Sequence, residues 1–110
     1  MIINNIDKFV TPGQMPTAFE AELLTILIEE CAEVQQRATK ILRFGVDEIQ
    51  PGQPHDNTQR LSVEVGDLLA VIDECINVDL IDASVVIEQK PIKIKKLAKF
   101  MQQENKNAKN

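Results

Sequence analysis

The longest uninterrupted pattern in the chain is an amphipathic stretch between Thr17 and Gly45, and it restricts the fold more than any other feature. Thr17 and Glu20 fit a capping box, in which the threonine caps a helix and the glutamate three positions later reaches back to it. Gly45 suits a left-handed stop. We therefore predict one helix that ends at about Phe44 and measures roughly 40 Å, at 1.5 Å per residue.

The apolar face of this helix is unusually wide. At about 100° per residue, its apolar side chains cover an arc of roughly 200°, which is about twice what one core-facing stripe requires. The arc holds Leu23, Leu24, Ile26, Leu27, Ile28, Cys31, Val34, Ala38, Ile41, Leu42 and Phe44. Two partner helices from the same short chain would leave part of it uncovered, so we expect a homo-oligomer that completes a four-helix bundle.

Glycine and proline divide the chain around this helix. Residues 1–16 read as an irregular lead-in, and residues 45–56 read as a loop because each contains glycine and prolines. Asp56 or Asn57 can cap a second helix that runs to about Val78.

The C-terminal part is predicted less completely. A break at 79–82 precedes a short apolar stretch at 83–87 whose type the pattern leaves open. Pro91 suits the first turn of a third helix. The apolar members of this third helix are Ile92, Leu97, Phe100 and Met101. A polar tail follows at 103–110. No strand alternation is sustained, so the prediction is a single all-α domain over 1–110, built as an antiparallel helical bundle.

Composition excludes several classes of protein. A chain of 110 residues forms one domain and buries roughly 65% of its unfolded surface. It has four Phe, no Trp and no Tyr, with a net charge of −5, which argues against nucleic-acid binding by base stacking. The charge is uneven: residues 1–89 hold five basic and sixteen acidic residues, whereas 90–110 hold seven lysines and one glutamate. Such a distribution favours internal neutralisation or an anionic ligand held near cations.

Two further features bear on the compartment. Cys31 and Cys75 lie within apolar helical patterns and are predicted to be buried, reduced thiols, and no Cys/His spacing indicates zinc. Neither a signal-peptide pattern nor an apolar run of membrane-spanning length is present. We therefore expect a cytoplasmic protein without a membrane partner.

Acidic residues interrupt the apolar faces of both main helices. Glu30 falls inside the arc of the first helix and Glu33 at its edge, at about 100° per residue. On the second helix Glu64 falls inside the apolar arc and Asp67 at its edge. The ordinary alternative is that such acids mark the rim of an amphipathic helix, with their heads in water. Four acids in matched positions on two helices favour a shared site instead, because an unpaired buried carboxylate is costly.

Antiparallel pairing of the two helices brings these acids together. A cluster of carboxylates suits hard, oxygen-seeking ions, so we predict Mg²⁺, or Mn²⁺, rather than zinc. Mg²⁺ held in this way keeps positions for water and substrate phosphates. Arg37 and Lys40 lie further along the same side of the first helix as Glu30 and Glu33, and are candidates to hold phosphate oxygens. The alternative for Arg37 is an ordinary surface ion pair with Glu33.

These residues resemble the MazG-like family of all-α nucleoside triphosphate pyrophosphohydrolases. The family's EExxE motif is matched by Glu29, Glu30 and Glu33, and its later ExxD motif by Glu64 and Asp67. The resemblance covers about residues 18–80 and the lysine-rich segment that follows. It implies that Glu30, Glu33, Glu64 and Asp67 bind Mg²⁺. It also implies that a nucleoside triphosphate is split between its α and β phosphates, giving monophosphate and pyrophosphate, and that the protein forms dimers or tetramers.

Other parts of the chain fit the family less well. Some members have a basic-aromatic motif after the first helix, whereas this chain reads Lys-Ile-Leu-Arg-Phe-Gly over 40–45, so base recognition is not predicted. His55 is expected to be an exposed loop residue. The lysines between Lys90 and Lys99 either close over phosphates or form a solvated face. Of the acids, we name Glu33 as the catalytic base from its position at the edge of the apolar face.

Several functions stay open at this point. Within the enzymes, a deoxyuridine or deoxycytidine nucleotide pyrophosphatase and a phosphoribosyl-ATP pyrophosphohydrolase are close relatives of the predicted activity. From a different class, the chain could be a helical interaction or regulatory module that keeps the fold and the acids without turnover.

Overall fold

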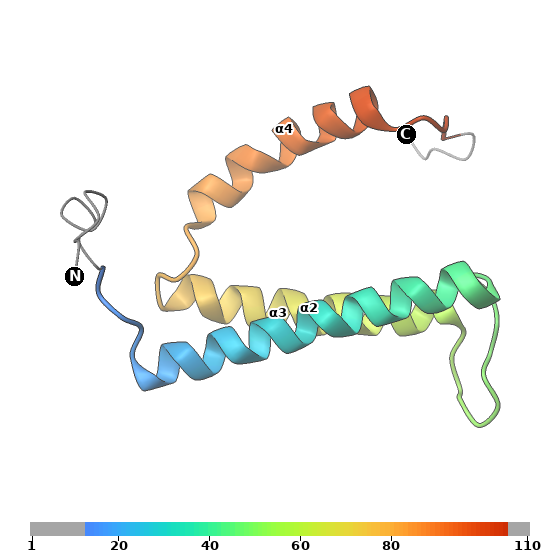
Figure 1. Ribbon diagram of the computed structural model, residues 1–110, viewed down its shortest axis with the longest axis horizontal. Helices are drawn as coiled ribbons and strands as arrows, with labels where there is room; N and C mark the ends of the chain where they lie inside the picture. Colours follow the sequence, from blue (N-terminus) through green and yellow to red (C-terminus); the bar gives the residue numbers. More distant parts are fainter. Residues whose placement is uncertain (1–12, 106–110) are drawn as a thin grey trace, which may run out of the picture.

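The computed structural model describes residues 13–105, which form three helices: α2 (Ala18–Phe44), α3 (Asn57–Asn77) and α4 (Ala83–Phe100). No strand occurs within these residues. α2 and α3 lie side by side and antiparallel, whereas α4 turns away from them (Figure 1). The all-α class is confirmed, as is the packing of the first two helices. The predictions for 1–12 and 106–110 lie outside the described residues.

The ends of α2 are those that the sequence predicts. The hydroxyl of Thr17 accepts the Glu20 N–H at 3.1 Å, and the Thr17 N–H donates to Glu20 Oε1 at 2.8 Å. This is the predicted capping box. At the other end Gly45 has φ +103° and ψ 162°, and its N–H donates to the Ile41 carbonyl at 2.9 Å. The stop is at the predicted glycine, in an extended conformation with positive φ that residues other than glycine rarely adopt.

α3 begins with a second capping box, which settles the choice between its two candidate caps. Asp56 accepts the Gln59 N–H at 2.9 Å, and the Asp56 N–H donates to Gln59 Oε1 at 2.9 Å. Asn57 instead is 2% exposed. Its amide donates to the Gly45 carbonyl at 2.9 Å and to Glu48 Oε1 at 3.1 Å. Asn57 thus ties the α2–α3 loop to the start of α3.

The prediction that the third helix starts at Pro91 was wrong, because α4 starts at Ala83 and runs through Pro91. Its cap is Asp82, which accepts the Ser84 N–H at 3.0 Å and the Ser84 hydroxyl at 2.6 Å. A proline removes one backbone hydrogen bond inside a helix without always ending it. The apolar stretch at 83–87 is therefore the first part of α4.

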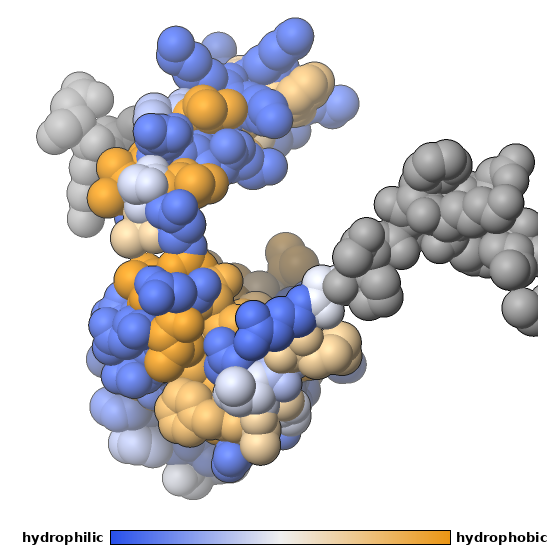
Figure 2. All heavy atoms as spheres, turned by 90° about the vertical axis from the view of Figure 1, so that its left-hand side faces the viewer, coloured by the Kyte–Doolittle hydropathy of each residue, from blue (hydrophilic) through white to orange (hydrophobic). Residues whose placement is uncertain are grey.

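The core of the single chain is small. Among the described residues only Leu23, Cys75 and Asn57 are buried. Large apolar side chains remain exposed on all three helices, and Figure 2 shows a hydrophobic patch on the α2–α3 pair. The cysteine prediction was half wrong: both thiols are free, but Cys31 is exposed. Cys31 lies on the part of the wide α2 arc that α3 does not cover.

No helix among the described residues has the length and the apolar character that crossing a membrane requires.

Candidate metal centre

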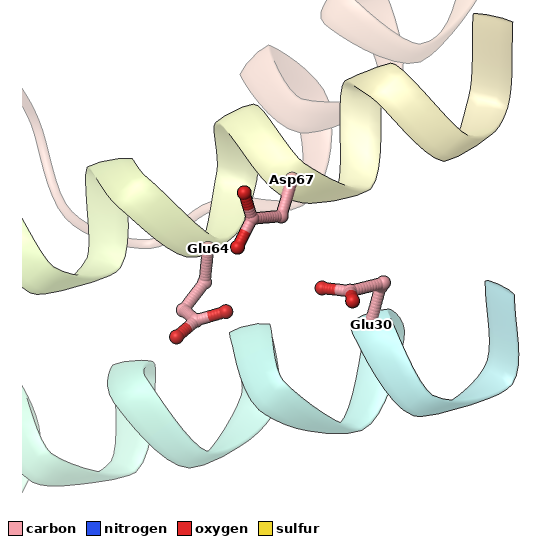
Figure 3. A group of neighbouring side chains, drawn as sticks. All are labelled: Glu30, Glu64 and Asp67. Atoms are coloured by element: carbon pink, nitrogen blue, oxygen red, sulfur yellow. The ribbon is translucent and has the colours of Figure 1, made fainter. Parts of the chain in front are cut away.

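Three of the four predicted acids meet across the α2–α3 pair. Glu30 comes from α2, and Glu64 and Asp67 come from α3, where they stand one turn apart on the same side (Figure 3). One carboxylate oxygen of each lies within 4.8 Å of the corresponding oxygens of the other two. Residues 13–105 hold no second group of three acids, histidines or cysteines in such an arrangement. The antiparallel packing of the two helices therefore produces the predicted cluster.

The surroundings of Glu30 show that this cluster lacks a counter-charge. Glu30 and Glu64 are partly buried, whereas Asp67 is exposed. Among the described residues, Glu30 Oε2 is a buried atom without a hydrogen-bond partner. An oxygen in this position has lost water without gaining a donor, which costs free energy. A cation placed among the three carboxylates would satisfy it, and an all-oxygen set fits Mg²⁺ or Mn²⁺.

Burial and mutual repulsion both act on the protonation of the cluster. Burial raises the pKa of Glu30 above 4.5, and the charges of Asp67, Glu33 and Glu29 add to the effect. Burial likewise raises the pKa of Glu64, followed by the charges of Glu33 and Asp67. A hydrogen bond between Glu64 and Glu33, in which a protonated Glu64 is the donor, raises it further. The cluster thus binds protons more tightly than free carboxyl groups do, as expected where positive charge is missing.

Glu33 lies beside the group of three without being part of it. Its side chain is exposed, and its charge raises the pKa of both Glu30 and Glu64. Glu29 is also exposed and is the last of the charges that act on Glu30. Of the three glutamates in the first motif, Glu30 is therefore the one within the cluster, and Glu33 is its immediate neighbour.

The two predicted phosphate contacts differ in their surroundings. Nη1 of Arg37 is buried and has no hydrogen-bond partner among the described residues. Lys40 Nζ lies over the Phe44 ring, 5.6 Å from its centroid, and Arg43 lies over the same ring at 5.0 Å. The structure thus leaves a donor of Arg37 without an acceptor, whereas Lys40 has a cation–π contact at the end of α2. His55 is exposed in the loop, as predicted.

Comparisons with protein-family models, with curated proteins and with solved structures gave no match for this chain. The functional argument therefore depends on the residues and geometry of the cluster.

Proposed function

We propose that this chain is a Mg²⁺-dependent hydrolase that splits a nucleoside or deoxynucleoside triphosphate between its α and β phosphates. The products are the monophosphate and pyrophosphate. The observation that carries the proposal is the group formed by Glu30, Glu64 and Asp67, whose oxygens lie within 4.8 Å of one another. The resemblance of the two acidic motifs to MazG-like pyrophosphohydrolases supplies the reaction and the substrate class.

Glu30, Glu64 and Asp67 would hold the metal, and Glu33 would complete the set or act beside it. When bound, Mg²⁺ supplies positive charge that neutralises the phosphate oxygens; Mn²⁺ has similar ligand preferences. We assign the general base to Glu33, because it is exposed to solvent and adjoins Glu64. It would take a proton from the water whose oxygen attacks a phosphorus of the α–β anhydride. The bond from that phosphorus to the bridging oxygen then breaks.

Arg37 is the stronger of the two candidates for the phosphates. A buried guanidinium nitrogen without an acceptor, on the helix that carries Glu30 and Glu33, suits a phosphate oxygen. Lys40 is the second candidate, although it would have to leave the Phe44 ring. No described feature selects a base, so we do not assign dUTP, dCTP or phosphoribosyl-ATP in preference to other triphosphates.

The assembly that we propose is a homodimer or homotetramer in which further helices complete the bundle around α2 and α3. The small core of the single chain supports this, because Leu23 and Cys75 are its only buried apolar residues among those described. A two-helix pair with so little buried surface needs further helices to be stable. We place the protein in the cytoplasm, where its two free thiols would stay reduced.

The test is pyrophosphate release from a panel of ribo- and deoxynucleoside triphosphates in the presence of Mg²⁺. Glu33→Gln should lower kcat by at least about 100-fold, which is typical for the loss of a general base. Asp67→Asn should lower activity by weakening the metal site. Asp73→Asn serves as the matched control, because Asp73 is an exposed acid on the same helix.

Equal background release by wild type, Glu33→Gln and Asp67→Asn with every nucleotide would refute the hydrolase. It would leave the helical interaction module as the better description. Activity that falls equally in Asp73→Asn would show that the acids act through general charge.

A further inference from the structure

α4 has almost no packing partner within its own chain. The helix–helix packing of the described residues is that of α2 against α3, and α4 diverges from both (Figure 1). The radius of gyration is 19.5 Å, whereas a compact domain of this length has about 13 Å. An amphipathic helix of 18 residues thus stands with its side chains exposed.

The exposed area matches what an assembly would bury. The accessible surface of the chain is 9614 Å², whereas a compact monomer of this mass exposes roughly 6,100 Å². The excess is larger than the roughly 1,000–2,500 Å² that each partner buries in an obligate dimer. A second copy is therefore sufficient to cover it.

One side of α4 is apolar. At about 100° per residue, Val86, Ile87, Ile94 and Leu97 fall within an arc of about 100°. Ile94 is 65% exposed. Ile92 lies two residues away and therefore about 200° round the helix, on the opposite side. α4 thus presents an apolar stripe that its own chain leaves open.

The α2–α3 pair offers a matching surface on the side away from the acids. Ile28 stands two residues before Glu30, and Leu69 stands two residues after Asp67. Each therefore lies about 200° round its helix from the acid cluster. Both side chains are exposed. Because the helices are antiparallel, the pairing that joins Glu30 to Asp67 also places Ile28 near the level of Leu69.

The charges of the two surfaces are complementary. α2 and α3 together carry nine acidic and four basic residues, whereas α4 carries five lysines and one glutamate. Opposite charge of this kind steers association and opposes pairing of α4 with another α4.

The joint between α3 and α4 opposes docking within one chain. The N–H groups of Leu80 and Ile81 both donate to the Cys75 carbonyl, at 2.9 Å and 3.3 Å. Cys75 itself is fully buried, and Asp82 then caps α4 through Ser84. Folding α4 back onto its own α2–α3 pair would disrupt these bonds.

We propose that α4 docks in trans, with its Val86–Leu97 stripe on the Ile28–Leu69 face of a second copy. In a twofold dimer the contact occurs twice, so each copy gives one α4 and receives one. The partner's α4 is then one of the helices that complete the bundle. This interface is independent of the proposed hydrolase activity, since it uses the side of the pair away from the acids.

The first test compares Ile94→Asp with Ile92→Asp in the full chain by sedimentation velocity over a range of concentrations. The wild type should be a dimer or a higher oligomer at micromolar concentration. Ile94→Asp should raise the dissociation constant by at least about tenfold, as expected for a central apolar contact. Ile92→Asp should change it by less than about threefold, since a rim substitution costs little. Equal effects of the two substitutions, or a wild-type monomer, would overturn the proposal.

The second test does not depend on the folding of a variant. Wild-type chains with ¹⁴N and with ¹⁵N are refolded together, and carboxyl groups are joined to nearby lysines with a carbodiimide. Mass spectrometry should find α4 lysines joined to acids of α2 or α3 in peptides of mixed isotope composition. If such links occur only between peptides of the same isotope, α4 docks in cis and the proposal is wrong. The absence of any α4 link to α2 or α3 would equally overturn it.

Discussion

Glu30 on α2 and Asp67 on α3 place carboxylate oxygens within 4.8 Å of each other, although they stand in different helices separated by a long loop. Asp67 is the strongest like charge acting on Glu30 and raises its pKa. Two carboxylates held so close repel each other, so their proximity lowers the stability of the metal-free protein. A cation that binds between them removes this cost.

Mg²⁺ should therefore raise the melting temperature of the protein. A metal that binds only the native state stabilises it by about 2.7 kcal/mol at one hundred times its dissociation constant. Asp67→Asn should remove most of the shift, whereas Asp73→Asn, an exposed acid on the same helix, should keep it. Differential scanning calorimetry with and without millimolar MgCl₂ or MnCl₂ measures this.

Sodium chloride of equal ionic strength is the control for screening. A shift of the same size with sodium, or none with either divalent ion, would count against the metal site.

The predictable parts of the fold are those with local signals. The two ends of α2 depend on Thr17, Glu20 and Gly45, which act within one turn, so the sequence is sufficient to place them. The start of α4 was missed because Pro91 suggested a helix start, while the cap at Asp82 is an equally local signal that was overlooked. The direction in which α4 leaves the pair depends on backbone contacts at the joint, and no periodicity reports these.

Stability without metal should fall as the pH rises above about 4.5. Glu30 and Glu64 have raised pKa values in the folded chain, so the folded state binds their protons more tightly than the unfolded state. Their contribution is fully present below the unfolded value of 4.5, and it is lost as the pH rises through the folded pKa. Urea unfolding in EDTA at fixed protein concentration, across a series of pH values, measures the decline.

Glu64→Gln should flatten this decline and stabilise the metal-free protein at neutral pH, while reducing the Mg²⁺ shift. Asp82 acts in the opposite sense: its hydrogen bond with the Ser84 hydroxyl, and then those from Val85 and Ser84 N–H groups, lower its pKa. Its contribution is present above 3.8 and is lost as the pH falls through the lowered folded value. A wild-type stability that rises from pH 5 to neutral at the same rate in Glu64→Gln would contradict the role of the cluster.

The candidate site could be predicted only as far as helix geometry reaches. The angular positions of Glu30, Glu64 and Asp67 around their helices are enough to bring them together once α2 and α3 pair. The contact of Lys40 with Phe44 and the buried nitrogen of Arg37 depend on side-chain conformation, so the same geometry does not distinguish them.

Arg37 should contribute to phosphate binding. Its buried Nη1 has no acceptor among the described residues, and a charged hydrogen bond is typically worth about 1.5–3 kcal/mol. Arg37→Gln should therefore weaken the binding of pyrophosphate with Mg²⁺ by at least about tenfold in calorimetry. Arg43→Gln is the matched control, because Arg43 is exposed and lies over the Phe44 ring. Equal affinity of wild type and Arg37→Gln would remove Arg37 from the site.

Asn57 should matter for stability although it lies outside the cluster. Its buried amide donates to the Gly45 carbonyl and to Glu48, and so joins the loop to α3. Asn57→Ala leaves these acceptors without their donor, at a cost of about 1–3 kcal/mol. For a domain of this size, each kcal/mol lowers the melting temperature by roughly 4–8 °C. Asn77→Ala, at the exposed end of α3, should change it little, because alanine is a good helix former. Thermal unfolding monitored by circular dichroism compares the two. If both variants melt with the wild type, the Asn57 contacts do not hold the loop.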